Sequence, residues 1–424
     1  MSLWIHAAAA KHPDRVAIES PERSLTYAEL AAQAVSAAGA LRDRGVGGGS
    51  RVAVALPAGV DFVVALHGCL LLGAAAVPID LRLSRSERAA RMAGADVVVA
   101  EPLGSAPLGM PSVFGSDPIV AVMHTSGTTA APKAVELTHA NFLASALGSA
   151  VALGLDPAER WLCPMPLTHV GGLSIPIRSA IYATSAVLHG HFDADMVLND
   201  LMDGGRRITL VSLVPTMLAR LLDSGLERPP TLRWALLGGG PIAPALLDRA
   251  SAAGVPVAPT YGMTEACSQI ATFGWPLPGV EVRTSADEVI VRGPIVSAGA
   301  VSEDGWLRTG DLGRFDERSR LVIIGRKADT IVSGGENVAP AEVEAALLEH
   351  PAVADAAVHA REDPEWGEAV VATVVPADGV AVSEDELRAF CGERVARFKV
   401  PKTIEFADSI PRTESGKLMR RELA

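Results

Sequence analysis

The alternation of short apolar runs with helical segments in the first two thirds of the chain limits its fold most strongly. Apolar runs of strand length occupy residues 51–56, 96–100, 208–213, 234–237 and 255–257. Helical segments separate them, and one opens at the capping-box pattern Thr26-Tyr-Ala-Glu29 and ends near Gly45. Apolar strands connected through helices are typical of mostly parallel sheets with helices on both faces. The pattern therefore predicts an α/β architecture.

The pattern changes after residue 280. Short strand signals at 288–292 and 320–324 lie in a turn-rich region and predict a small β-subdomain. From Arg326 onward the chain has the pattern of a separate α+β unit, with helices from Pro340 and Ser383. Its strand signals lie at residues 369–375 and 403–406. We therefore expect a large N-terminal domain over residues 1–325 and a small C-terminal domain over residues 326–424.

The longest apolar run, residues 62–79, is interrupted by His67, Gly68 and Gly73 and is shorter than the about 20 apolar residues of a membrane span. It predicts a buried helix that leads into a strand. The N-terminus lacks the basic segment of a secretion signal. We expect a cytoplasmic protein that does not enter a membrane.

Charge and cysteine content exclude two further classes. The net charge is −12, from 37 basic and 49 acidic residues, which gives no electrostatic basis for binding nucleic acid. The four cysteines are scattered, at positions 69, 163, 267 and 391, and no pair has metal-binding spacing. They are expected to be reduced thiols, as in a cytosolic protein.

A polar loop follows the apolar run 118–123, which predicts a buried strand. Small polar residues fill positions 125–129, and Lys133 comes four residues later. A loop without bulky side chains can bring backbone N–H groups and hydroxyls to polyphosphate oxygens. The sequence is not a Walker A motif, because Pro132 precedes the lysine and Ala134 follows it. An ordinary polar loop is the alternative interpretation.

Six further segments combine glycines with hydroxyl, carboxylate, aromatic or cationic residues. They are residues 166–173, 237–241, 261–265, 305–313, 325–344 and 411–417. In order and residue type they resemble the signature of the adenylate-forming superfamily, which includes acyl-CoA synthetases, peptide-synthetase adenylation domains and firefly luciferase. The resemblance runs from about residue 13 to residue 423. Four stretches resemble most the 2-succinylbenzoate–CoA ligases of menaquinone biosynthesis, namely residues 214–218, 236–242, 261–270 and 333–337.

The resemblance implies two half-reactions that use ATP, Mg²⁺ and coenzyme A. A substrate carboxylate attacks the α-phosphate of ATP, pyrophosphate leaves, and the thiolate of coenzyme A then displaces AMP from the acyl-adenylate. Negative charge develops on oxygens in both steps, so positioned cations and donors are expected instead of a protein nucleophile. The fold implied is a large domain with mostly parallel sheets and a small C-terminal domain that rotates between the half-reactions.

The resemblance also implies residue roles. The β- and γ-phosphates would bind Thr125, Ser126, Gly127, Thr128, Thr129 and Lys133. The adenine would lie beside Gly239, Gly240, Pro241, Tyr261, Gly262 and Met263. Thr264 would contact the α-phosphate, Glu265 would hold Mg²⁺, Asp311 would accept the ribose hydroxyls, and Arg326 would lie near the ribose or a phosphate. Lys417 would bridge the carboxylate and α-phosphate. His169, Arg178, Ser268, Gly334 and Gly335 would contact the acyl substrate or the thiol.

Arg178 carries the most specific hypothesis. The acid 2-succinylbenzoate has two carboxylates and only one is activated, so a buried second carboxylate needs a cation. Arg178 follows His169 by nine residues, in the region that lines the acyl pocket of this family. The alternative is a surface arginine on a helix.

Other residues also have simpler interpretations. Asp311 could be a turn aspartate, Lys417 a solvated lysine near the chain end, and Tyr261 a core aromatic residue. His169 could line an acyl pocket or cap a loop. The pair His189 and His191 is interpreted as a strand-end loop in preference to a metal site, since no Cys or third His lies nearby.

Three alanines depart from the family pattern. Ala130 and Ala134 replace glycine in the phosphate loop, where a methyl group would hinder a positive-φ backbone, and Ala328 occupies the hinge, leaving Lys327 or Asp329 as pivot. The charged groups of the implied chemistry are all retained.

The alternatives to 2-succinylbenzoate ligation are another small or aromatic acid, a carrier-protein acceptor, or a silent nucleotide-binding relative. A homodimer is a further expectation.

Overall fold

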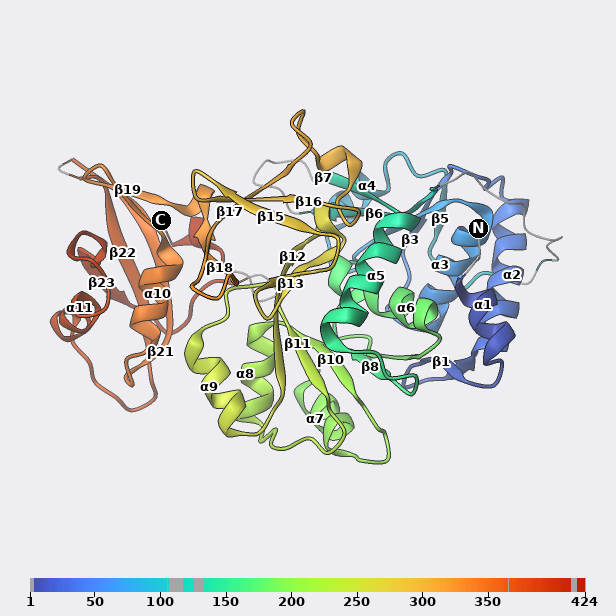
Figure 1. The fold of residues 1–424 in the computed structure, drawn as a ribbon, viewed down its shortest axis with the longest axis horizontal. Helices are drawn as coiled ribbons and strands as arrows, with labels where there is room; N and C mark the ends of the chain where they lie inside the picture. Colours follow the sequence, from blue (N-terminus) through green and yellow to red (C-terminus); the bar gives the residue numbers. More distant parts are fainter. Residues whose placement is uncertain are drawn as a thin grey trace.

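The computed structural model describes residues 4–104, 106, 117–125, 133–364, 366–412 and 418–423. Within these residues the strands form four sheets, and the C-terminal sheet lies at one end of the long axis of the molecule (Figure 1). The two large, mainly parallel sheets lie in the N-terminal part. A four-stranded sheet follows them, and the C-terminal sheet lies at the far end.

The first sheet has three parallel pairs and one antiparallel hairpin. Its strand order is β5 (Val97–Val99), β3 (Arg51–Val54), β4 (Ala75–Pro78), β6 (Ile119–Thr125) and β7 (Lys133–Thr138). The helices of this part of the chain are α1 (Trp4–Lys11), α2 (Tyr27–Asp43), α3 (Val60–Leu72), α4 (Arg85–Met92) and α5 (His139–Leu153).

Two local predictions are confirmed here. Thr26 and Glu29 form a reciprocal capping box at the start of α2. The apolar run 62–79 forms the buried helix α3, which ends at Gly73 in the left-handed conformation and leads into β4.

The second sheet is larger and again mostly parallel. Its order is β14 (Trp275–Pro276), β13 (Ser268–Thr272), β12 (Val257–Met263), β11 (Trp234–Leu237), β10 (Leu210–Leu213), β8 (Arg160–Cys163), β9 (Ser185–Leu188), β1 (Val16–Glu19) and β2 (Ser24–Thr26). The helices between these strands are α6 (Val170–Tyr182), α7 (Ala194–Met202), α8 (Pro215–Asp223) and α9 (Pro244–Ala252).

The N-terminal segment completes this second sheet. Strand β1 pairs in parallel with β9, far along the chain. The buried hydroxyl of Tyr27 donates to the backbone carbonyls of Ser179 and Thr184, each at 2.7 Å. Strand β1 and Tyr27 are therefore fixed to the segment around residue 185.

One strand prediction is wrong in its bounds. The strand expected at 255–257 begins only at Val257 and continues to Met263. Pro256 has no N–H to donate, although its carbonyl accepts from Ala235 (2.7 Å). The strand extends further because β13 pairs with it antiparallel, with a register shift between Tyr261 and Gly262.

The remaining strands form two smaller sheets. The four-stranded antiparallel sheet has the order β15 (Glu281–Ser285), β16 (Glu288–Arg292), β17 (Leu307–Phe315) and β18 (Leu321–Arg326). The C-terminal sheet contains β20 (Glu336–Val338), β19 (Ile331–Ser333), β22 (Gly367–Pro376) and β21 (Val353–Asp363), with β23 (Thr403–Phe406) beside β22. Its helices are α10 (Pro340–Leu348) and α11 (Glu384–Gly392). These elements confirm the expected β-subdomain and α+β unit.

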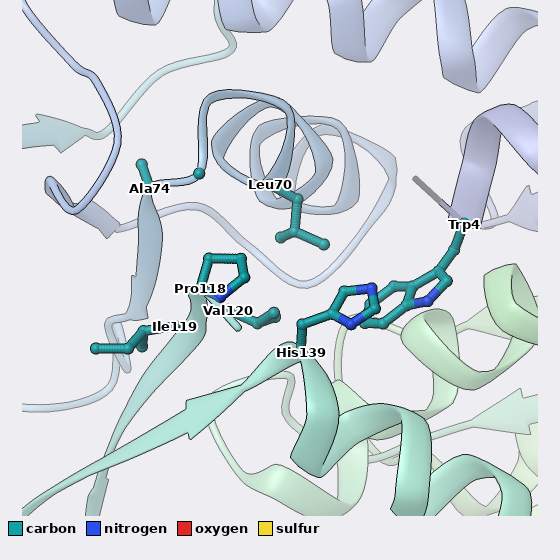
Figure 2. Close-up of a pocket in the computed structure, with 8 residues that line it drawn as sticks. Trp4, Leu70, Ala74, Pro118, Ile119, Val120 and His139 are labelled. Atoms are coloured by element: carbon teal, nitrogen blue, oxygen red, sulfur yellow. The ribbon is translucent and has the colours of Figure 1, made fainter. Parts of the chain in front are cut away.

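A small apolar pocket lies beside α1 (Figure 2). Trp4 stacks on His139 there, with ring centroids 4.2 Å apart, and Leu70 and Val120 complete the lining. The pocket holds about 10 Å³, little more than a water molecule. It is therefore too small for a nucleotide.

No helix in the described part of the chain is long and apolar enough to cross a bilayer.

Candidate active site

Three of the predicted site residues meet where β12, β17 and β18 come together. The hydroxyl of Tyr261 donates to Oδ2 of Asp311 (2.6 Å), and Nε of Arg326 lies 2.6 Å from Oδ1 of the same carboxylate. The Asp311 side chain is 6% exposed, whereas Arg326 is 46% exposed. Asp311 lies within β17 and pairs with Arg326 of β18, so the turn-aspartate alternative is wrong.

The protonation of this cluster is fixed by its surroundings. Burial, together with the nearby Asp311 carboxylate, raises the pKa of the Tyr261 hydroxyl well above its ordinary value. Tyr261 is therefore a donor at any working pH. Two donors orient the carboxylate of Asp311, and its lone pairs give it further acceptor capacity, which suits a vicinal diol.

Strand β12 leads into a strained turn that carries Thr264 and Glu265. The turn η1 (Thr264–Ala266) is 3₁₀, and Cys267 and Ser268 after it both have positive φ, 49° and 91°. L side chains rarely adopt that conformation, and such residues cluster at functional sites. A Cβ at Gly262 would overlap the carbonyl of Ser268, so glycine is required there.

The segment Gly239-Gly240-Pro241 follows the end of β11 and is exposed. Gly239 has φ of +82°, a conformation that favours glycine. Strand β11 is the direct neighbour of β12, which carries Tyr261. The two predicted adenine-binding segments therefore come from adjacent strands.

The phosphate loop starts and ends in one hairpin. Thr125 pairs with Lys133 across β6 and β7, and the Thr125 hydroxyl lies 3.4 Å from the Lys133 carbonyl. The predicted phosphate ligands Ser126, Gly127, Thr128 and Thr129 lie outside the described residues, as does Ala130. Ala134 pairs with His124 in extended strand β7. The expectation that Ala134 occupies a position needing positive φ is therefore wrong.

His169 is the N-cap residue of α6, and its side chain makes no capping hydrogen bond. The residue as a whole is exposed, while burial of the imidazole lowers the pKa of His169. Gly172 in the first turn has no room for a side chain, because a Cβ there would contact the Pro166 carbonyl. The helix therefore starts tightly against the 166–168 loop and leaves the imidazole free to face a ligand.

Arg178 is buried on the same helix, with 1% of its surface exposed, so the surface-arginine alternative is wrong. Its guanidinium donates to Ser145 Oγ of α5 (2.9 Å) and lies 5.6 Å from the ring centre of Trp161. Ser145 donates in turn to the carbonyl of Cys267 (2.7 Å). Two hydrogen bonds therefore connect Arg178 to the strained turn after Glu265.

The charge of Arg178 has no counter-charge in the described part of the chain. No described carboxylate forms an ion pair with Arg178, and its Nε has no hydrogen-bond partner there. Burial lowers the pKa of the Arg178 guanidinium. A buried cation without an anion is costly. The site therefore favours an anionic ligand.

Other predicted residues lie away from this cluster. Gly334 and Gly335 form the positive-φ turn between β19 and β20, at the outer end of the C-terminal sheet (Figure 1). The Gly334 N–H donates to the Trp366 carbonyl (2.8 Å). The structure does not bring this turn to Asp311. Lys417 lies outside the described residues.

Ala328 lies in the 3₁₀ turn η3 (Lys327–Asp329). Its two charged neighbours bind opposite parts of the chain: Lys327 pairs with Glu288 of β16 (3.2 Å), and Asp329 pairs with Arg420 (2.9 Å).

His189 binds Asp200 (2.9 Å) directly after β9, and the described residues hold no cluster of three His, Cys, Asp or Glu side chains. The ion pair with Asp200 places His189 at the end of a strand, as expected.

Sequence reasoning did not identify the partners of these residues. The partners of Arg178, which are Ser145 and Trp161, come from distant segments, and so does Arg420, which binds both Asp329 and Glu344. One signal was available, because Glu344 stands between the apolar residues Val343 and Leu347 on a helix face that packs inward. A buried carboxylate needs a partner.

Comparisons with known proteins find relatives along the whole chain. The AMP-binding enzyme family matches residues 5–106 and 100–291, and the C-terminal domain of AMP-binding enzymes matches residues 342–417. A 2-succinylbenzoate–CoA ligase from Bacillus licheniformis is 38% identical over 99% of this chain and 98% of its own. The o-succinylbenzoate CoA synthetase (MenE) from Bacillus subtilis has been solved with the acyl-adenylate OSB-AMP, and it matches with a TM-score of 0.90 and 35% identity over 100% of this chain and 98% of its own. The same synthetase with ATP and a magnesium ion also scores 0.90, at 35% identity, covering 100% of this chain and 99% of its own.

Proposed function

Because this chain belongs to the AMP-binding enzyme family, we propose that it is an ATP-dependent 2-succinylbenzoate–CoA ligase. It converts 2-succinylbenzoate, ATP and coenzyme A into 2-succinylbenzoyl-CoA, AMP and pyrophosphate through an acyl-adenylate. The observation that carries the proposal is the full-length likeness to 2-succinylbenzoate–CoA ligases, together with the Tyr261–Asp311–Arg326 cluster. The pathway this serves is menaquinone biosynthesis.

The nucleotide would be held from both sides. Asp311 accepts the ribose hydroxyls, while Tyr261 and Arg326 keep its carboxylate in place. The adenine lies between the Tyr261 ring and the open backbone after β11. The hydroxyl of Thr264 donates to the α-phosphate, and Thr125 and Lys133 border the loop that receives the β- and γ-phosphates.

The donor set suits Mg²⁺, because Glu265 offers one carboxylate and ATP supplies phosphate oxygens. When bound, Mg²⁺ withdraws charge from the phosphates and so favours the departure of pyrophosphate. Lys417 then stabilises charge between the attacking carboxylate and the α-phosphate. Coenzyme A thiolate subsequently attacks the acyl carbon, and AMP leaves with the electron pair of the broken C–O bond.

Arg178 is proposed to pair with the carboxylate that is not activated. Arg178 is a buried cation with no carboxylate partner among the described residues, and two hydrogen bonds connect it to the strained turn after Glu265, which supports this role. Ser268 and His169 are proposed to border the same substrate.

The proposed division of the chain places a large N-terminal domain at residues 1–325 and a small C-terminal domain at residues 326–424. The change from the antiparallel sheet ending at β18 to the C-terminal sheet supports a boundary at the turn η3. Gly334 and Gly335 are proposed to approach the thiol only after the small domain rotates.

The protein is also proposed to be cytoplasmic and homodimeric. Its four cysteines are free and buried, which fits a reducing compartment. The outer face of α5 supports self-association: this helix has no Asp, Glu, Lys or Arg, and Leu147 and Val151 are 56% and 69% exposed. Light scattering should find a dimer for the wild type and a monomer for Val151→Glu.

The first experiment is an endpoint assay with ATP, Mg²⁺, coenzyme A and 2-succinylbenzoate, resolving AMP, ADP and acyl-CoA by chromatography. Equal amounts of AMP and 2-succinylbenzoyl-CoA are expected. A derivative of the acid with the non-activated carboxylate converted to an amide is the matched control, and it should react poorly. If AMP forms only with another acid, the assignment of the substrate is refuted. If no acid gives AMP, the assignment as a ligase is refuted.

A further inference from the structure

The backbone that carries Asp311 departs from a regular sheet. Residues 308 and 312 of strand β17 are four positions apart, whereas their partners on β16, residues 290 and 288, are only two apart. The extra residues of β17 form a bulge, and Gly310 within it has φ of +71°. A bulge interrupts the hydrogen bonds of the sheet, so its backbone groups need other partners.

Glu288 of β16 is the first of these partners. Its Oε1 accepts the N–H of Gly310 (3.1 Å), and its Oε2 lies 3.2 Å from Nζ of Lys327. The Glu288 side chain is 9% exposed, and a buried carboxylate is stable only with such contacts. Glu288 therefore binds the residue before Asp311 and the residue after Arg326, which are themselves an ion pair.

Thr309 is the second partner. Its hydroxyl donates to the Val289 carbonyl (2.7 Å) and accepts the N–H of Asp311 (3.0 Å). The residue is 6% exposed. Side-chain groups thus replace the hydrogen bonds of the sheet on both sides of Gly310. They fix the direction in which the Asp311 side chain leaves the backbone.

We propose that Glu288 is a positioning residue that aims the Asp311 carboxylate at the ribose hydroxyls, and so sets how strongly the protein prefers a ribonucleotide to a deoxyribonucleotide. This inference rests on the nucleotide site of the proposed function. Glu288 acts through the Gly310 peptide. Because hydrogen bonds weaken steeply when their angle falls, a small rotation of that peptide weakens the contacts with the ribose and leaves those with the adenine.

Two substitutions remove the support of Asp311 from opposite sides of the bulge. Glu288→Leu removes the acceptor of the Gly310 N–H, whereas Glu288→Gln keeps an amide oxygen in its place. Thr309→Val removes the acceptor of the Asp311 N–H with little change in shape. It tests the same inference even if Glu288→Leu does not fold. Asp311→Asn is the benchmark.

The matched control is Glu281→Leu. Glu281 also forms an ion pair within the four-stranded sheet, with Arg292 (2.8 Å), but its side chain is 51% exposed and it contacts no residue of the bulge.

The test measures nucleotide binding in the full-length protein by titration calorimetry, with AMP and with 2′,3′-dideoxy-AMP. The two nucleotides share the adenine and the phosphate, so the ratio of their Kd values isolates the ribose hydroxyls. An exchange assay, in which pyrophosphate exchanges with ATP only when the acid is present, then gives the KM values for ATP and for 2-succinylbenzoate.

The wild type should bind dideoxy-AMP about 10- to 150-fold more weakly than AMP, which is the contribution of hydrogen bonds to a charged group. Glu288→Leu and Thr309→Val should each lower this ratio about 2- to 30-fold and raise the KM for ATP in the same range. Both should leave the Kd for dideoxy-AMP and the KM for 2-succinylbenzoate within about twofold of wild type. Glu288→Gln should retain most of the wild-type ratio, and Glu281→Leu should retain all of it.

An unchanged ratio in both Glu288→Leu and Thr309→Val, alongside a lowered ratio in Asp311→Asn, overturns the inference but not the proposed function. Equal weakening of both nucleotides also overturns it, because that is the result of a purely structural role. A wild type that binds AMP and dideoxy-AMP equally well overturns the inference together with the ribose contact of Asp311. Absence of exchange with 2-succinylbenzoate, when the binding ratios are as expected, refutes the proposed substrate and supports the inference.

Discussion

Replacing Arg178 by methionine should have opposite effects on folding and on substrate binding. The substitution removes one charge-assisted hydrogen bond to Ser145, worth about 1.5–3 kcal/mol, and one cation–π contact with Trp161, worth about 1–2 kcal/mol. It also relieves the desolvation of a fully buried ion, which costs several kcal/mol. Ser145 keeps its bond to the Cys267 carbonyl, so no polar group is orphaned. Arg178→Met should therefore leave the ligand-free protein as stable as wild type or more stable, by up to about 3 kcal/mol.

Substrate binding should weaken instead. Removing one partner of a buried charge pair costs about 2–5 kcal/mol, which corresponds to a KM for 2-succinylbenzoate raised about 30- to 5000-fold. Guanidinium unfolding measures the first effect, and steady-state AMP formation measures the second. Unfolding in the presence of the acid tests both effects in one experiment. At 100 times its Kd the acid should raise the free energy of unfolding of the wild type by about 2.7 kcal/mol, and the same concentration should raise that of the variant by almost nothing.

Two controls separate an anion site from a structural arginine. Arg160→Met removes one of the two arginines that pair with Glu19, Arg160 at 2.6 Å and Arg206 at 2.7 Å, so this variant should lose stability without a change in KM. The amide derivative of the acid should show the same KM with wild type and with Arg178→Met. A variant that is less stable than wild type and binds 2-succinylbenzoate normally would refute the assignment.

Three further predictions concern the backbone, the nucleotide and acid stability. Gly262→Ala should lower the free energy of unfolding by about 3 kcal/mol or more, measured by guanidinium titration, while Gly299→Ala, with open space around it, should change it by less than about 1 kcal/mol. Tyr261→Phe should raise the KM for ATP about 5- to 10-fold in the exchange assay, since Asp311 loses one orienting donor, and an unchanged KM would count against that role. Burial lowers the pKa of His67 to about 3, so between about pH 6.5 and pH 3 only the unfolded chain binds a proton at this histidine. The free energy of unfolding therefore falls as the pH drops below about 6.5, by about 3 kcal/mol at pH 4.5. His67→Leu should abolish this contribution to the difference in stability between pH 7 and pH 4.5.

The parts of the fold that short-range rules govern could be predicted from the sequence. The Thr26–Glu29 capping box, the helix and strand within 62–79 and the strand at 288–292 depend on neighbours within a few residues. The far end of β12 was missed because its extension to Met263 depends on pairing with β13. Register across a bulge is a tertiary property that local pattern does not encode.

The candidate site divides in the same way. The residue types at Tyr261, Asp311 and Arg326 could be chosen from the sequence, and the structure brings all three together. The surroundings of Arg178 could not be predicted from the sequence, because its burial is decided by how α5 packs on α6. A surface arginine and a core arginine look the same in the sequence. The Arg420–Asp329 ion pair joins residues 91 positions apart, and it could not be predicted from the sequence either.

The pairing of β1 with β9 sets the order in which this protein can finish folding on the ribosome. Strand β1 emerges first, yet its parallel neighbour at Ser185–Leu188 appears only after residues 20–184 have been made. At about 5–20 residues per second, that delay is on the order of 10–30 s. During this interval Ala17 and Ile18, both buried in the finished sheet, can pair with β2 but lack their parallel neighbour β9, and Tyr27 lacks its two acceptors. The second sheet therefore cannot close around β1 until β9 has been synthesised.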